Sequence, residues 1–220
     1  MRFQLLLISW LAAISNALNI MSLGDSIVGS GCWQAILWQR LNSTGLLQSK
    51  KIEFVGTLHS KQCGFAFDGD NEGHSDQLVT KVAEQNKVSE WLVSVESPDM
   101  VLMHFGTYDL LAQVSPKRIL EAYTTIVEQL RKSNIYVKIF VAQILPIHSD
   151  ACWNCNIKVK RLNDQIPSWA SRLSKGDSPI YVVDQYDGYP NRNTIGGILP
   201  DELGDELFAR KWYHAIVPHL

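Results

Sequence analysis

The chain has 220 residues, 46% of them hydrophobic, and its 20 Lys and Arg residues against 22 Asp and Glu residues give a net charge of -2. This length and composition suit one globular domain with a sizeable core, and nothing in them indicates a cofactor. The chain has no polybasic stretch and no interleaving of basic with aromatic residues, which argues against a nucleic-acid partner.

Residues 1–17, MRFQLLLISWLAAISNA, have the pattern of a secretory signal peptide: Arg2, a short apolar run, and a small-x-small cleavage pattern that ends at Ala17. A buried first helix is the alternative, but this run has no amphipathic period and is too short to span a bilayer. No later segment is long enough to span one either. We therefore expect a secreted, extracellular protein with no membrane partner, and a single domain over residues 18–220.

Apolar strand-like runs alternate with helical patterns along the rest of the chain. Strands are predicted at 18–23, 52–56, 99–105, 136–144 and 180–184, and helices at 34–41, 78–95, 116–132, 157–173 and 201–217. The strands are almost continuously apolar, as in parallel sheets covered on both faces. We predict an α/β three-layer sandwich with a five-stranded parallel sheet of the flavodoxin-like kind.

Polar loops follow the predicted strands, and ligand sites in such sheets form beyond the carboxyl ends of strands. The segment 57–77 is rich in Gly and Asp and is predicted to be a long loop, which inside a compact domain is usually functional. The other loops of interest span 24–31, 106–115, 145–156 and 185–200.

Four cysteines remain after the signal peptide: Cys32, Cys63, Cys152 and Cys155. An even number in a secreted chain predicts two disulfides, with three pairings to choose from. Cys152 and Cys155 are close enough to pair locally, which leaves Cys32 with Cys63. A zinc site or a redox CxxC motif ranks lower, and we expect no metal. Asn42 begins an Asn-Ser-Thr sequon, which is a weak signal for glycosylation.

Residues 22–27, SLGDSI, place Ser26 directly after the first predicted strand. The N–H groups at the start of the next helix would favour an anion there, so Ser26 is a candidate nucleophile. The alternative is that Asp25 or Ser26 only caps this helix, and this stretch alone favours the cap.

Three loop motifs together, GDSI, DNEGHS and HFGTYD, closely resemble the SGNH (GDSL-type) hydrolases. Further stretches resemble the secreted fungal acetylxylan esterases of carbohydrate esterase family three: CWQAILWQRL, IEFVGTL, CGFAFDGDNEGHS, VAQILPI, LNDQIPSWA, VVDQYDGY and ARKWYHAI. The resemblance covers essentially the whole mature chain.

The resemblance implies a role for each matching position. Ser26 matches the nucleophile, and Gly73 matches a glycine whose N–H helps to form the oxyanion hole. Tyr108 stands where the family has an oxyanion-hole asparagine. In the last motif, aligned on the flanking proline and glycine, Leu199 stands in place of the general-base histidine and Gly196 in place of the aspartate that orients it.

These replacements predict an esterase that is silent or very weak, because leucine cannot take the serine proton. An active carboxylic ester hydrolase with a relocated base, His74 or His148, is one alternative. A non-enzymatic secreted module that binds carbohydrate or protein is another. Tyr108 either occludes the acyl pocket, packs as an ordinary residue, or donates a hydrogen bond in place of the asparagine.

Other polar and aromatic residues of these loops are compatible with carbohydrate binding, with a hydrogen-bond network that holds the loops as the alternative. They are Asp25, Asp70, Asn71, Asp109, Trp33 and Trp153. We expect a monomer whose ligand is a polysaccharide such as acetylated xylan.

Overall fold

A computed structural model describes residues 17–60, 63–148 and 152–220, so the expected signal peptide lies almost entirely outside the described residues. Its centre is a sheet of seven strands: β1 (Leu18–Gly24), β2 (Ile52–Phe54), β3 (Leu58–His59), β4 (Asp70–Gly73), β5 (Met100–His104), β6 (Lys138–Ala142) and β7 (Ile180–Val183). The strand order is β3-β4-β1-β5-β6-β7. β2 pairs with β1 along the same edge as β4. All pairs except β3 with β4 are parallel. The predicted α/β class and its five strands are confirmed.

The sheet has two strands more than predicted, and both lie in the expected loop 57–77. β4 pairs with the end of β1, in the register Leu23 to Glu72 and Gly24 to Gly73, while β2 pairs with its beginning. β4 has the sequence Asp-Asn-Glu-Gly, which carries no apolar pattern by which a strand is recognised. Its buried side chains form hydrogen bonds instead of packing in the core.

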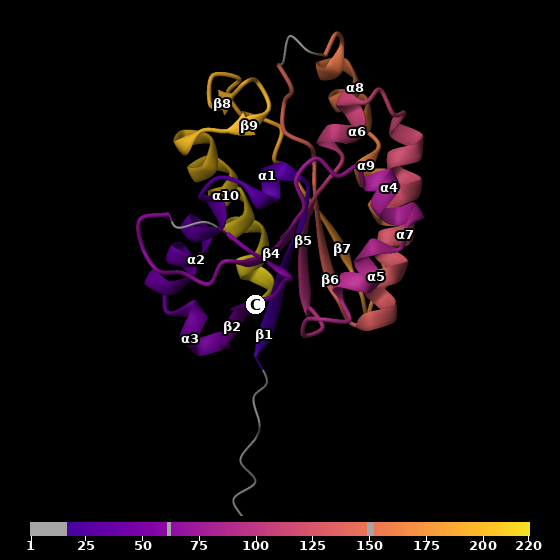
Figure 1. The fold of residues 1–220 in the computed structure, drawn as a ribbon. Helices are drawn as coiled ribbons and strands as arrows, with labels where there is room; N and C mark the ends of the chain where they lie inside the picture. The colour runs from indigo at the N-terminus through magenta and orange to yellow at the C-terminus, as the bar shows by residue number, and fades with distance from the viewer. Residues whose placement is uncertain (1–16, 61–62, 149–151) are drawn as a thin grey trace, which may run out of the picture.

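Helices cover both faces of the sheet (Figure 1). On one face lie α4 (Val79–Glu84), α5 (Lys87–Trp91), α7 (Pro116–Ser133), α8 (Cys155–Asn163) and α9 (Ile166–Leu173), and on the other α2 (Trp33–Ser43), α3 (Leu46–Lys50) and α10 (Glu202–Ile216). Alternate residues of β5 enter the two separate cores, with Val101 and Met103 on one side and Met100 and Leu102 on the other. The central strands are apolar on both faces for this reason.

Two predicted helices are each divided in the structure. The segment 78–95 forms α4 and α5, separated at Asn86, whose φ of 54° is outside the helical region. The segment 157–173 forms α8 and α9, and Pro167 lies in the first turn of α9, where its missing N–H is tolerated. The prediction for α7 is confirmed, with the Ser115 side chain accepting from the N–H of Arg118.

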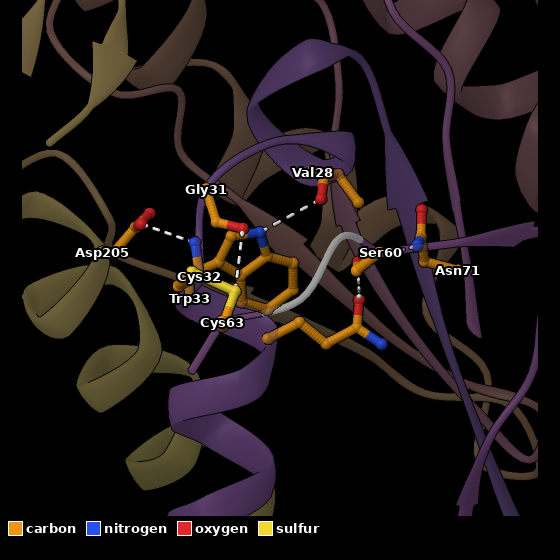
Figure 2. The surroundings of a disulfide bond; sticks show 9 residues. Val28, Gly31, Cys32, Trp33, Ser60, Cys63, Asn71 and Asp205 are labelled. Carbon is orange, nitrogen blue, oxygen red and sulfur yellow. Dashed lines mark hydrogen bonds between the residues drawn. A yellow bond between two sulfur atoms is a disulfide. The ribbon is translucent and has the colours of Figure 1, made fainter. Parts of the chain in front are cut away.

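Both expected disulfides are present, Cys32–Cys63 and Cys152–Cys155. The first joins the start of α2 to the segment between β3 and β4 (Figure 2). Asp205 of α10 accepts from the N–H of Cys32 over 2.6 Å, so three separate segments meet at this bridge. Within the described ranges, no group of three His, Cys, Asp or Glu residues is arranged to hold a metal ion. No helix of the described part is long and apolar enough to cross a membrane.

Candidate active site

Three adjacent strands, β4, β1 and β5, end at the same edge of the sheet, and the loops after them meet there. The short helix α1 (Ser26–Gly29) begins directly after β1, and α6 (Thr107–Leu111) begins after β5. Asp25 caps α1 by accepting from the N–H of Ile27 over 3.1 Å, so Ser26 is the first helical residue, and only 6% of its surface is exposed.

The Ser26 hydroxyl has two neighbours that the structure defines. Ser26 Oγ accepts a hydrogen bond from the backbone N–H of Asp76 over 3.1 Å. The side chain of Tyr108, in the first turn of α6, lies close enough to Ser26 to affect the pKa of its phenol. Neither group is a base positioned to take the serine proton, because an amide N–H can only donate and a phenol is protonated at neutral pH.

Asp76 is a residue that the motif comparison did not identify. Its φ of 59° lies in the left-handed region that usually favours glycine, and Asp is among the few other residues that tolerate it. This conformation turns its N–H toward Ser26. The sequence places Asp76 in the loop after the Glu-Gly-His block, so this loop could be expected near Ser26. The local sequence does not indicate which backbone N–H of the loop faces the serine.

Gly73 uses its N–H elsewhere. That N–H donates to Asn71 Oδ1 over 2.8 Å. A Cβ at Gly73 would lie 2.2 Å from the nitrogen of Gly29, so the absent side chain allows α1 to approach β4. Position 73 therefore requires glycine because the backbones of α1 and β4 approach each other closely there.

Asp25 is fully buried and joins two of the loops. Its second oxygen accepts from the N–H of Thr107 over 3.1 Å. Burial raises the pKa of Asp25 to about 7, although hydrogen bonds from Ile27 and Thr107 act in the opposite direction. Both oxygens are engaged by backbone N–H groups, so this carboxyl fixes the geometry between α1 and α6.

Tyr108 is half-buried against the same groups. Burial raises the pKa of its phenol; the interaction with Ser26 opposes this shift, and the charges of Asp76 and Asp25 add to it. The phenol is consequently held in its protonated form beside Ser26.

The last loop folds as a small hairpin of β8 (Thr194–Ile195) and β9 (Leu199–Pro200). Gly196 and Gly197 form its turn with φ of 62° and 71°, the pattern of a type I′ turn. β9 contacts α1, and Leu199 packs against the core cluster that includes Ile27 and Val28 of this helix.

The candidate replacement bases are engaged elsewhere. His74 Nε2 lies 2.6 Å from Oε2 of the buried Glu72, and its ring stacks on Trp91 with centroids 3.8 Å apart. The exposed His148 ring contacts Asn156, while its backbone N–H donates to Gly197 O over 2.8 Å. Among the described residues, no histidine nitrogen hydrogen-bonds to Ser26 Oγ.

His104, at the end of β5, is buried and also unsuited to act as a base. Its Nε2 accepts from the N–H of Leu145 over 3.3 Å. Burial lowers the pKa of His104 to about 3, so the ring is neutral in the folded chain. It packs edge-on against Phe208 as a core residue.

The remaining predicted site residues mostly hold the loops together. Asn71 donates to Ser60 Oγ and Gly69 O, and Asp109 accepts from the N–H groups of Val79 and Thr80 at the start of α4. Trp33 is not available to a sugar, because it is 1% exposed and its ring packs edge-on against Phe208. Trp153, by contrast, is 87% exposed.

The sequence and the fold were compared with those of known proteins. No protein-family model matches the sequence, and no curated protein matches it. Solved structures do match: an acetyl esterase mutant with acetate ion is 27% identical, with 91% of this chain and 97% of that chain covered and a TM-score of 0.83. A carbohydrate esterase family 3 protein from Talaromyces cellulolyticus is 28% identical, with the same coverage and a TM-score of 0.82.

A member of the lipolytic G-D-S-L family from Veillonella parvula shares the fold at 18% identity, with 93% of this chain and 100% of that chain covered and a TM-score of 0.64. The fold and the serine after β1 define the class: this chain has the SGNH hydrolase architecture. Within that class it resembles the family 3 carbohydrate esterases.

Proposed function

We propose that this protein is a secreted carbohydrate acetyl-ester esterase homologue that keeps the Ser26 position but has little or no hydrolytic activity. The observation that carries the proposal is the environment of Ser26 Oγ, which contacts the Asp76 N–H and the Tyr108 phenol. Leu199 lies beside α1 in place of a base. The two disulfides support a secreted location, because such bonds persist in oxidising compartments.

Of the three replacements, the one at the base position has the largest expected effect on the rate of ester hydrolysis. In a serine hydrolase, loss of the base alone costs about as much as loss of the whole triad, roughly 10⁶-fold in turnover. What remains is the roughly 10³–10⁴-fold acceleration over water that binding and an oxyanion hole provide.

The test is hydrolysis of p-nitrophenyl acetate and acetylated xylan by four proteins. They are the parent, Ser26→Ala, the revertant Leu199→His/Gly196→Asp/Tyr108→Asn, and that revertant with Ser26→Ala. We expect the parent to match Ser26→Ala, and the revertant to gain a rate that disappears when Ser26 is replaced. Thermal melting of each protein checks that the site has not unfolded.

Two outcomes would change the conclusion. Hydrolysis by the parent that is lost in Ser26→Ala and in His74→Ala or His148→Ala would establish an active enzyme with a relocated base. A folded revertant that stays silent would show that the replacements at these three positions do not account for the lost activity.

We also propose that the protein binds the polysaccharide class on which such esterases act. Trp153 supports this, because it is 87% exposed in the turn closed by Cys152 and Cys155. That turn lies against α6, which carries Tyr108: Cys155 Sγ is 3.7 Å from Leu110 O. Exposed aromatic faces stack on sugar rings. Titration with acetylated xylan oligosaccharides should show weaker binding for Trp153→Ala than for Tyr136→Ala, a control that removes a 65% exposed aromatic ring at the opposite edge.

A further inference from the structure

Two helices of the same face, α7 and α9, border a cavity of about 380 Å³. α7 ends at Ser133 just before β6, and α9 ends at Leu173 just before β7, so the cavity lies near the amino ends of these parallel strands. Ser26 follows the carboxyl end of β1. The cavity is therefore near the opposite edge of the sheet from the candidate active site. Figure 1 shows α7 running along the sheet between these two edges.

Positive charge dominates the lining of this cavity. Arg131 and Lys132 come from the last turn of α7, Arg172 from that of α9, and Lys175 from the segment after it. Glu128 is the one acidic residue of the lining. Within the described ranges, none of these four cations forms an ion pair. A chain of net charge -2 thus concentrates unpaired cations at one place.

Arg131 is held in position by the protein itself. Its Nε donates to Ser178 Oγ over 2.9 Å, and its Nη2 donates to the carbonyl of Ser178 over 2.6 Å. Ser178 is fully buried and in turn donates to Val137 O over 2.7 Å. Two of the guanidinium N–H groups are used in this way, which leaves the others for a ligand. Burial lowers the pKa of Arg131, and no carboxylate offsets this effect.

The same residues also have an explanation that involves no ligand, because cations stabilise the carbonyl ends of helices. This explanation accounts for Arg131 and Lys132 on α7 and for Arg172 on α9, taken one helix at a time. It does not require them to share one cavity, nor does it account for Lys175, which lies beyond the end of α9.

We propose that this cavity binds a tetrahedral oxyanion, a phosphate or sulfate group carried by a larger ligand. Arginine presents N–H groups in a planar fork that matches two oxygens of such a group, and lysines add charge without a fixed geometry. The volume exceeds that of the anion alone, which leaves room for the part of the ligand that carries it. The inference is independent of the proposed esterase-like function.

The experiment is isothermal titration of the full chain with inorganic phosphate, inorganic sulfate and glucose 6-phosphate at low salt, with glucose as the uncharged control. We expect both ions to bind, the sugar phosphate to bind more tightly than free phosphate, and glucose not to bind. Added NaCl should weaken binding, because exposed charges are screened. Equal affinity for free and carried phosphate would overturn the claim that the cavity holds a larger ligand.

Two variants that each lose two positive charges distinguish binding in this cavity from nonspecific electrostatic attraction to the protein. Arg172→Gln/Lys175→Gln removes two lining cations, whereas Lys117→Gln/Arg118→Gln removes two exposed cations from the other end of α7. Affinity should fall about tenfold or more in the first variant and stay unchanged in the second, since charge-assisted hydrogen bonds are lost only in the first. Both should melt close to the parent. No binding by the parent, or equal losses in both variants, would overturn the proposal and leave only the helix-end role.

Discussion

The backbone N–H of Asp76 donates to Ser26 Oγ over 3.1 Å, which joins the loop after β4 to the first residue of α1. This contact depends on the left-handed backbone of Asp76, with φ of 59°. A residue fifty positions away in the sequence thus donates a backbone hydrogen bond to the serine hydroxyl. The Ser26 hydroxyl is therefore held by a backbone donor from a separate loop.

The conformation of Asp76 predicts opposite effects for two substitutions. Asp76→Gly should be neutral or stabilising, because glycine adopts positive φ without a steric penalty. Asp76→Ala should lower the free energy of unfolding by about 1 kcal/mol, since alanine has no short polar side chain to support this conformation. Urea denaturation of the two variants measures the difference. An alanine variant more stable than the glycine variant would contradict the assigned backbone.

Gly73 is predicted to be sensitive to any side chain. Gly73→Ala would place a Cβ 2.2 Å from the nitrogen and 2.4 Å from the Cα of Gly29, and both are backbone atoms that cannot move independently. We expect a loss of more than about 2 kcal/mol in the free energy of unfolding. Gly176→Ala is the matched control, because nothing lies within 4 Å of a Cβ there. Equal stability of the two variants would refute the close approach of α1 to β4.

The pKa of Asp205 predicts how the free energy of unfolding depends on pH. Burial raises the pKa of Asp205 to about 6 from 3.8; the hydrogen bond from Cys32 opposes the shift, and three neighbouring carboxylates favour it. The folded chain therefore holds a proton that the unfolded chain has lost between about pH 4 and pH 6. Over this range the free energy of unfolding falls as the pH rises.

Asp205→Asn tests this sign directly. The amide oxygen can still accept from the Cys32 N–H, and the amide nitrogen can take the place of Oδ1, which has no hydrogen-bond partner. Above pH 6 we expect the variant to be more stable than the parent by roughly 1–2 kcal/mol, with a flatter profile below. Melting temperatures from pH 4 to pH 8 measure it. Asp25 contributes a slope of the same sign up to about pH 7, because burial also raises its pKa, whereas His104 contributes the opposite slope below about pH 6.5, because burial lowers its pKa to about 3. The difference between variant and parent therefore isolates the contribution of Asp205.

The two disulfides should contribute unequally to stability. Cys32 and Cys63 are separated by 31 positions, whereas Cys152 and Cys155 are separated by 3. The chain-entropy relation gives about 3–4 kcal/mol for the first loop and about 2 kcal/mol for the second. Paired alanine substitutions and urea denaturation compare them. A larger loss on removing the short bridge would show that chain entropy does not dominate.

The β-branched and aliphatic runs that form β1, β5, β6 and β7 were predictable because strands buried on both faces must be apolar along their length. β4 was not, because its residues are polar and its pairing with β1 depends on backbone contacts. The division of the 78–95 helix at Asn86 was also hidden, since the apolar spacing continues across it.

The sequence by itself determined the fold class and the pairing of the cysteines. Its resemblance to the SGNH hydrolases predicts the residues at the nucleophile, base and oxyanion positions, and these stay predictions. Each depends on local pattern or on residue type. Only the tertiary structure decided that Asp76 donates to Ser26, that His74 is held by Glu72 and Trp91, and that Trp33 is buried. Such relations join segments far apart in the chain, and their geometry depends on how the strands are ordered in the sheet.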